Sequence, residues 1–356
     1  MRLGGAYGIV KVRKRVRKQE IVKRWIIVWM CLGVLISGCS AQSGTPETQV
    51  NVYSARHYDV DQAILADFEA ETGIKVNLIE GKADELLVRL QREVEDPVAD
   101  VFITVGAESL SSALASGVLA PLPKLDGLDQ VAASLKGERW VGITQRARVI
   151  VYDKTTTTPT LSTYAELADP AYRNQILVRS STSSYNLALV SDLIQRQGVS
   201  QTASWAQGLV DNFARVPTGN DRDQAKALVA GLGTYVIMNT YYLALLANSA
   251  DAAERAVAEK LAVIFPQDTH VNLSWAGLIT NAKNPNAAQA LVEYLLSAEV
   301  QSRYTQENGE YPVRGDVEPS DFLKALGNLP AYAADYERLG DKTLEALALF
   351  DAVRWP

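Results

Sequence analysis

Two adjacent tyrosines, Tyr241 and Tyr242, stand between two apolar runs of the sequence. The first run, 235–238, predicts a buried strand, and the second, 243–246, predicts the start of a helix with Asn239 or Thr240 as its N-cap. Both tyrosines are therefore expected at a strand-to-helix turn. Because ligands bind at the carboxyl ends of strands in α/β sheets, this turn is a candidate binding site. The alternative is that one ring packs in the core and the other lies on the surface.

Two further turns carry the same kind of side chain. His57 and Tyr58 follow a predicted strand over 50–54, and Tyr185 follows a short strand and the serine-rich loop 179–184. One histidine and four tyrosines thus stand at three strand ends. A single tyrosine at a strand end would be weak evidence for a site, whereas these five residues together form a candidate binding site. The serine-rich loop itself either binds an anion through its N–H groups or simply caps the helix that follows.

Phenolate oxygen is a hard anionic ligand, and a hard trivalent cation such as Fe(III) prefers it to sulfur ligands. Free tyrosine has a pKa of about 10, so ligation at neutral pH requires the metal to displace the phenolic proton. His57 could add a nitrogen ligand. Arg179 or Arg222 could lie next to the ligands without contacting the metal, and could lower the pKa values of the phenols or neutralise excess negative charge. The alternative is that both are ordinary surface arginines.

The elements that would position these residues alternate along the chain. Alternating strands and helices predict βαβ units and an α/β fold with a mainly parallel sheet. Two long strand-like runs, 140–152 and 271–280, are long enough to cross between two lobes, and the first is interrupted by Arg146 and Arg148. The remaining strands are expected at 74–78, 99–105, 176–178, 235–239 and 261–265, and the later helices at 287–296, 298–306, 321–326 and 342–353.

A chain of 356 residues is long enough for two domains, and its hydrophobic and charged fractions, 47% and 21%, are those of a soluble globular protein. Residues 1–24 hold nine of the 35 Lys and Arg residues, so the remainder is strongly acidic. An acidic body argues against a nucleic-acid partner, whose phosphates need a basic surface.

The pattern of residues 1–38 predicts a bacterial export signal. The apolar stretch 25–36 follows the basic residues and has the length of a signal-peptide core. Next, Leu35-Ile36-Ser37-Gly38-Cys39 resembles a lipobox, with Ile36 where leucine is commonest, which predicts diacylation of Cys39. The alternatives are an uncleaved anchor or an ordinary signal peptide. The polar stretch that follows predicts a flexible tether.

Cysteine and histidine are scarce in the remainder of the chain. Both cysteines, Cys31 and Cys39, lie in the N-terminal segment, which excludes disulfides, zinc–thiolate sites, iron–sulfur clusters and cysteine nucleophiles in the folded body. Only His57 and His270 are present, so a multi-histidine metal site is not expected. A serine hydrolase would need one of them, and the sequence lacks a Gly-x-Ser-x-Gly motif.

Several segments together resemble the ferric-iron-binding proteins of bacterial iron ABC transporters, in the cyanobacterial-type branch where Tyr directly follows His. The resemblance spans roughly 50–315 and rests on Asn51-Val52-Tyr53-Ser54-Ala55-Arg56-His57-Tyr58, Thr72-Gly73-Ile74-Lys75-Val76, Glu80-Gly81-Lys82-Ala83-Asp84-Glu85-Leu86, Ala99-Asp100-Val101, Arg146-Ala147-Arg148-Val149, Asn239-Thr240-Tyr241-Tyr242-Leu243 and Gln306-Glu307-Asn308-Gly309-Glu310-Tyr311-Pro312-Val313.

The resemblance implies a type II periplasmic binding protein fold, with two α/β lobes, two crossing segments and a ligand cleft. The expected division is a lipoprotein signal peptide over 1–38, a tether over 39–49, an N-terminal lobe of 50–147 plus 272–322, and a C-terminal lobe of 148–271 plus 323–356. The implied iron ligands are His57, Tyr58, Tyr185, Tyr241 and Tyr242. In some relatives a synergistic anion such as carbonate or phosphate completes the coordination of Fe(III).

The resemblance also implies a function outside the cytoplasm and not an enzyme. The protein would be a monomer in the periplasm or on the outer face of the cytoplasmic membrane, anchored only through lipid on Cys39, and it would deliver iron to an ABC permease. The same fold could instead hold a polyamine, thiamine or an oxyanion. A hydrolase that uses a serine of 180–184 and a purely structural lipoprotein are the readings from other classes.

Overall fold

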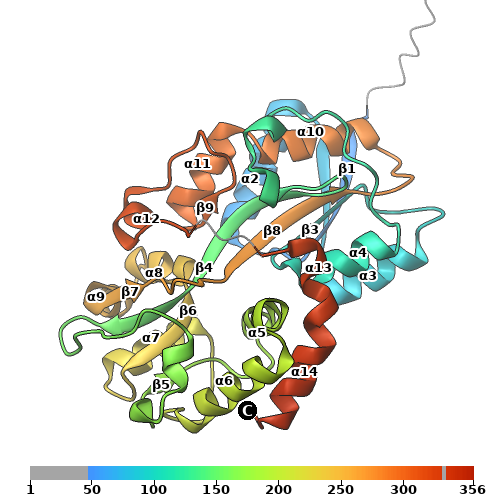
Figure 1. Ribbon diagram of the computed structural model, residues 1–356. Coiled ribbons are helices and arrows are strands. Elements are labelled where there is room, and N and C mark those ends of the chain that lie inside the picture. The colour runs from blue at the N-terminus through green and yellow to red at the C-terminus, as the bar shows by residue number, and fades with distance from the viewer. Residues whose placement is uncertain (1–46, 331–333) are drawn as a thin grey trace, which may run out of the picture. The chain divides into compact units, whose positions relative to one another are not determined.

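The computed structural model describes residues 47–330 and 334–356 (Figure 1). The predicted signal peptide over 1–38, Cys39 and the tether up to Pro46 lie outside the described residues. Within the described part of the chain, no helix combines the length and apolar character needed to cross a membrane.

The first lobe is built on parallel strands at one edge of the sheet. Strand β1 (Gln49–Ser54) pairs in parallel with β2 (Lys75–Glu80) and β3 (Val101–Thr104), and β3 pairs antiparallel with β8 (Val271–Leu278). Alternate apolar residues of β1, such as Val50 and Val52, are fully buried in this core. Its helices are α2 (Asp59–Thr72), α3 (Ala83–Arg92), α4 (Leu110–Ala115), α10 (Pro285–Leu295) and α11 (Ala298–Glu307).

Strand β4 (Val141–Asp153) runs through both lobes, as expected for a crossing strand. Its first half pairs with β8, and the last pair of that register joins Ala147 to Val271. From Arg148 onward β4 pairs instead with β6 (Tyr235–Asn239), and further along with β7 (Leu261–Ile264). The change of partner between Ala147 and Arg148 places these two residues at the junction of the lobes. The short strand β9 (Tyr311–Pro312) also pairs with the first half of β4.

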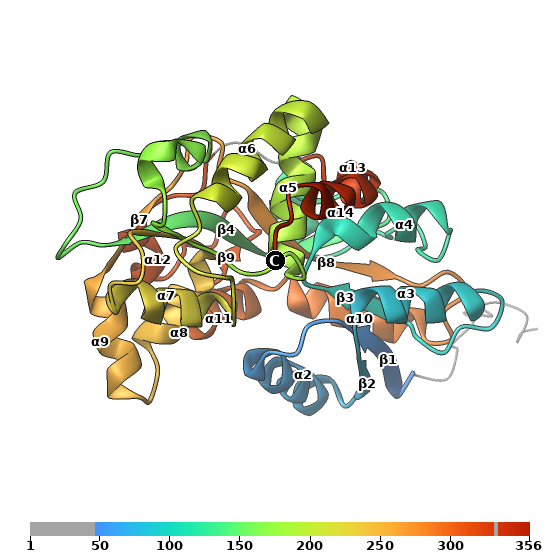
Figure 2. The same cartoon turned by 90° about the horizontal axis from the view of Figure 1, so that it is seen from below.

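The second lobe has a core on each face of its sheet, because side chains of a strand alternate between faces. On β6, Tyr235 and Ile237 pack in one core, and Val236 and Met238 pack in the other. Figure 2 shows α5 (Ser184–Gln197) and α6 (Val199–Asp211) on one side of β4, and α7 (Asp221–Val229) and α8 (Thr240–Ala247) on the other. Helices α6 and α9 (Ala252–Lys260) were not part of the sequence prediction. Strand β5 (Ile176–Leu177) pairs in parallel with β6.

The C-terminal segment departs from the predicted division. We expected 323–356 in the second lobe, but α13 (Tyr336–Leu339) packs into the first core through Tyr336 and Leu339. The chain then enters the second core with α14 (Thr343–Ala352), which packs on α5. Helix α12 (Asp321–Leu326) contributes Phe322 and Leu326 to the second lobe. The other predicted lobe boundaries stay a prediction.

Gly309, in the turn between α11 and β9, is expected to tolerate no side chain. It has φ +64°, and a Cβ atom there would lie 2.2 Å from the Cβ atom of Ala244 on α8. We expect Gly309→Ala to lower the free energy of unfolding by about 2–4 kcal/mol, from left-handed backbone strain plus overpacking.

Gly73, the C-cap of α2, is the matched control. It has φ +73° but open space around its Cα atom, so Gly73→Ala should cost about 1 kcal/mol, from the backbone alone. Urea unfolding of both variants measures the difference. Equal losses would show that the contact with Ala244 is not a constraint.

Candidate metal centre

Three tyrosine hydroxyls meet at one point of the structure. The hydroxyl of Tyr185 lies 3.2 Å from that of Tyr58 and 3.3 Å from that of Tyr241. Tyr58 immediately precedes α2, while Tyr185 and Tyr241 are the second residues of α5 and α8. Each helix start follows the end of a strand or its loop, so the turns bring together residues that are 127 positions apart in the chain.

The other two predicted ligands lie beside these three tyrosines. The ring of Tyr242 is 4.1 Å from the ring of Tyr241, measured between centroids, and it is half-buried. The His57 ring stacks on the Tyr58 ring at 6.0 Å and is exposed. The five residues that the sequence singled out therefore lie in one region, with Tyr185 and Tyr241 buried.

Burial and mutual proximity raise the pKa values of three of these phenols, Tyr58, Tyr241 and Tyr242. Burial raises the pKa of Tyr58 and of Tyr241 well above 10, and the neighbouring Tyr185 raises both further. Burial, together with Tyr185, also raises the pKa of Tyr242 to about 12. At neutral pH these three hydroxyls are uncharged.

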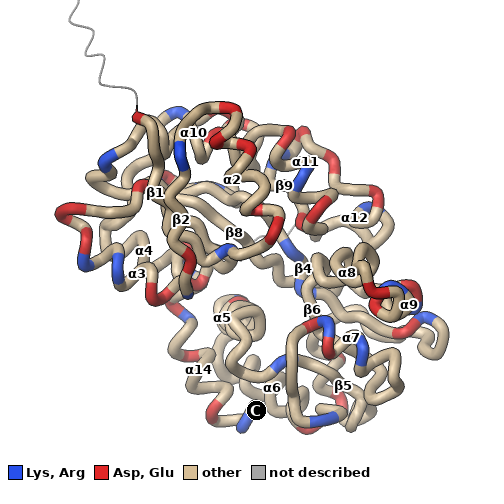
Figure 3. Tube along the Cα trace, turned by 180° about the vertical axis from the view of Figure 1, so that it is seen from behind, with Lys and Arg blue, Asp and Glu red and all other residues tan. Residues whose placement is uncertain are grey.

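Positive charge lies directly against the tyrosine cluster. Arg146 and Arg148 are two residues apart on β4, so both point to one face of the strand. The central guanidinium carbon of each lies 5.9 Å from the centroid of the Tyr185 ring, and that of Arg179 lies 5.8 Å from it. Arg56 covers the Tyr58 ring at 4.9 Å. Figure 3 shows basic positions on β4 where it passes between the two parts of the sheet.

The two predicted supporting arginines differ in position. Arg179 contacts the Tyr185 ring, as expected. Arg222 is directed at Glu254, 3.9 Å away, and it does not contact the tyrosine cluster within residues 47–330 and 334–356. The sequence prediction therefore missed Arg146 and Arg148 and named Arg222 in their place. The available signal was their position inside an otherwise apolar strand, because a charge buried there requires a partner.

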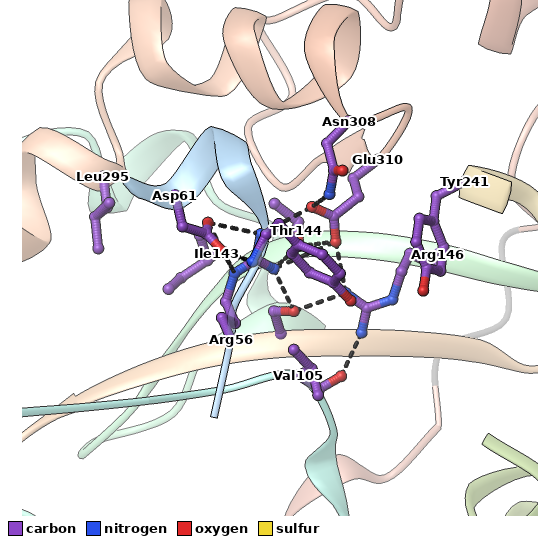
Figure 4. Close-up of polar contacts among 12 residues, drawn as sticks. Arg56, Asp61, Val105, Ile143, Thr144, Arg146, Tyr241, Leu295, Asn308 and Glu310 are labelled. Carbon is purple, nitrogen blue, oxygen red and sulfur yellow. Dashed lines mark hydrogen bonds and ion pairs between the residues drawn. The ribbon is translucent and has the colours of Figure 1, made fainter. Parts of the chain in front are cut away.

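Glu310, just before β9, is the partner of Arg56 and Arg146. Its carboxylate lies 2.9 Å from Nη2 of Arg56 and 2.5 Å from Nη1 of Arg146, with all three side chains fully buried (Figure 4). It also accepts hydrogen bonds from Thr144 and Asn308, both at 2.8 Å. Burial raises the pKa of Glu310, but Arg56 and Arg146 lower it more, and the resulting pKa is about 2. Sequence analysis assigned Glu310 no role.

The tyrosine cluster has the donor chemistry of a hard-metal site. The described residues contain no group of three or more His, Cys, Asp or Glu side chains arranged to hold a metal. Donors about 2 Å from a small hard cation are about 3 Å apart, which is close to the spacing of the three hydroxyls. A cation among them would replace the protons that the phenols now share, and the nearby guanidinium groups offset the negative charge of the phenolates.

Comparison with known proteins agrees with this chemistry. Residues 63–331 match the family described as bacterial extracellular solute-binding protein. The chain is 38% identical to "Iron uptake protein A1" of Synechocystis sp., covering 90% of this chain and 93% of the relative. It is 40% identical to "Iron uptake protein A2" of the same organism, covering 89% and 91%.

Solved structures are similar over nearly all of the described residues. A Trichodesmium protein described as "(IdiA) (FutA) in complex with iron and citrate ligands" is 41% identical, with a TM-score of 0.80 over 86% of this chain and 100% of that one. The "Ferric binding protein from Campylobacter jejuni" is 37% identical, also with a TM-score of 0.80 over 86% and 100%. The predicted two-lobed α/β fold and the predicted resemblance are confirmed. On this evidence the chain belongs to the family of bacterial extracellular solute-binding proteins.

Proposed function

We propose that this protein captures ferric ion outside the cytoplasm, between its two lobes, and delivers it to an ABC permease for import. The observation that carries the proposal is the convergence of the Tyr58, Tyr185 and Tyr241 hydroxyls, 3.2 and 3.3 Å apart, from three separate elements. Tyr242 and His57 complete the proposed ligand set. Fe(III) is the cargo, because phenolate is a hard donor that favours a hard trivalent cation.

The relatives support this assignment of cargo. Their printed names describe iron uptake and ferric binding, and one structure holds iron together with citrate. An external anion that shares the ion is therefore part of the proposal. Tyr58 comes from the first lobe and Tyr185 from the second, so their contact joins the lobes around the ion, and the closed form is what a permease would recognise.

Two of the competing readings, a polyamine site and a hydrolase, find no matching chemistry among the described residues. A polyamine needs free carboxylates, but Glu310 is already shared by two guanidinium groups. A hydrolase needs a histidine beside a serine. His270 pairs with Asp192 at 2.7 Å through Nδ1, and its Nε2 meets no hydroxyl among the described residues.

The test is an optical titration of the purified protein, without its N-terminal leader, stripped of metal. Ferric citrate should produce a visible phenolate-to-iron charge-transfer band that saturates at one equivalent. Tyr294→Phe is the matched control and should leave the band unchanged, because the Tyr294 hydroxyl bonds to Glu71 on the surface of the first lobe. A folded protein without the band would contradict ferric binding through tyrosines.

Iron binding should weaken steeply as the pH falls. Tyr58, Tyr241 and Tyr242 are protonated in the free protein, with a pKa of about 12 for Tyr242, so each phenolate that they form on binding releases a proton. The apparent affinity should fall about tenfold per pH unit for each proton released. Titrations between pH 6 and 8 measure how the apparent affinity changes with pH. The concentration of the citrate species that competes for iron is held constant across these titrations. An affinity independent of pH would exclude ligation by these tyrosines.

We further propose that the mature chain is a monomer that begins at a lipidated Cys39 and is held by that lipid at the outer face of the cytoplasmic membrane. The lipobox-like stretch supports this placement. Mass spectrometry of the N-terminal peptide from the membrane fraction tests it directly. A mature chain with an unmodified N-terminus would contradict the anchor without affecting iron binding.

A further inference from the structure

A second buried ion pair lies beneath the tyrosines of the second lobe. Nη1 of Arg148, on β4, lies 2.6 Å from Oδ2 of Asp221, the first residue of α7, and both side chains are fully buried. It is distinct from the Glu310 network, because neither Arg148 nor Asp221 contacts Glu310 in the described part of the chain. Neither residue is one of the five proposed ligands.

Arg148 connects this pair to the start of α5. Its Nη2 donates to Oδ1 of Asn186 at 2.8 Å, and Asn186 directly follows Tyr185. The amide nitrogen of Asn186 in turn donates to the carbonyl oxygens of Arg179 and Ser180, at 2.8 and 3.1 Å. Arg148 therefore fixes both the first turn of α5 and the loop that leads into it.

Asp221 connects the same pair to the start of α8. Its Oδ2 also accepts the backbone N–H of Asn239 at 2.9 Å. Asn239 is the N-cap of α8, two residues before Tyr241. Oδ2 of Asp221 thus accepts hydrogen bonds from both Arg148 and the backbone of Asn239. The path from Tyr185 to Tyr241 runs through Asn186, Arg148, Asp221 and Asn239.

We propose that Asp221, held by Arg148, is a positioning residue for metal capture that fixes the Tyr185 and Tyr241 hydroxyls relative to each other. The proposal rests on the proposed function. Two helix starts from opposite faces of the second-lobe sheet must present their oxygens at 3.3 Å before an ion arrives. Ligands held in place in advance bind a metal more tightly, and loss of such supporting contacts typically costs about 10–100-fold in affinity.

We expect the pair to be replaceable without loss of the fold. The second oxygen of Asp221, Oδ1, makes no hydrogen bond among the described residues, and its neighbour Arg179 stays 3.9 Å away. Apolar side chains of similar volume often replace a buried ion pair at little or no cost in stability. The double variant Arg148→Met/Asp221→Leu should therefore fold while it lacks the link between α5 and α8.

The experiment compares three proteins with the unaltered one: Asp221→Asn, the double variant, and Asp100→Asn. Asp100 is a matched control, because it is a fully buried carboxylate in the first lobe that accepts backbone N–H groups of Asn51 and Asn284 and has no described contact with the tyrosines. For each protein, thermal unfolding, ferric affinity by competition with citrate, and the wavelength of the charge-transfer band are measured.

We expect Asp221→Asn and the double variant to lose about 10–100-fold in ferric affinity and to shift the band. Asp100→Asn should lower the unfolding temperature but keep both the affinity and the band. If the folded double variant binds iron with unchanged affinity and an unchanged band, the inference is overturned. If the unaltered protein shows no band at all, the proposed function fails, and the inference fails with it.

Discussion

Tyr185→Phe is expected to lower the affinity for ferric ion by more than about 100-fold, beyond the loss typical of a supporting residue. Tyr185 is the centre of the cluster, because its hydroxyl is the one that bonds to both Tyr58 and Tyr241. Removing that oxygen deletes one ligand and also separates the other two. The three guanidinium groups around its ring would then lose the phenolate of Tyr185.

The measurement is a competition titration against citrate, followed by the charge-transfer band. Tyr235→Phe serves as the control, because Tyr235 is a buried tyrosine of the same lobe whose ring packs against Tyr172 away from the cluster. The control should bind ferric ion as the unaltered protein does. A Tyr185→Phe variant that kept its affinity within a few-fold would remove Tyr185 from the ligand set.

Glu310→Gln is expected to lower the free energy of unfolding by about 3–5 kcal/mol, since it leaves the buried Arg146 without a carboxylate and Arg56 with Asp61 alone. Glu307→Gln is the control. Glu307 is on the same segment, but its ion pair with Arg303 is partly exposed to solvent and should contribute less than about 1 kcal/mol. Urea unfolding at neutral pH compares the two, and equal losses would contradict a special role for Glu310.

The Glu310 carboxylate should also make the stability of the protein depend on pH, and the direction of that dependence follows from its lowered pKa. Its pKa is lowered from 4.5 to about 2 by folding, so its contribution of roughly 3 kcal/mol is present above pH 4.5. That contribution is lost as the pH falls from 4.5 through 2, where the folded state must take up the proton. The difference in stability between the unaltered protein and Glu310→Gln should therefore narrow over that interval. A constant difference would indicate that Glu310 does not titrate in this way.

The sequence predicted which tyrosines converge in the structure, because each sits at a local signal. Tyr58, Tyr185 and Tyr241 follow recognisable strands and begin helices, and such turns can be read from a short window of residues. The long run around Arg146 likewise predicted the crossing strand. Local periodicity also predicted most strands of both lobes.

The charged residues packed around those tyrosines could not be predicted in the same way. Glu310 is 254 positions from Arg56, and Asp221 is 73 positions from Arg148, so neither pairing leaves a trace in a local pattern. Arg222, adjacent to Asp221, was predicted to support the phenolates but points toward Glu254. In the first turn of α7, the Asp221 side chain points into the protein and the Arg222 side chain points outward. Which of two neighbouring residues points inward depends on how the helix packs in the folded protein, and this cannot be predicted from a local pattern.

The two buried arginines of β4 also constrain the number of residues between them. Arg146 is held in the first lobe by Glu310, and Arg148 is held in the second by Asp221, with only Ala147 between them. Because side chains alternate along a strand, a single residue inserted at Ala147 would turn one guanidinium group to the opposite face. An insertion or deletion at this junction should therefore be tolerated less well than a substitution beside it.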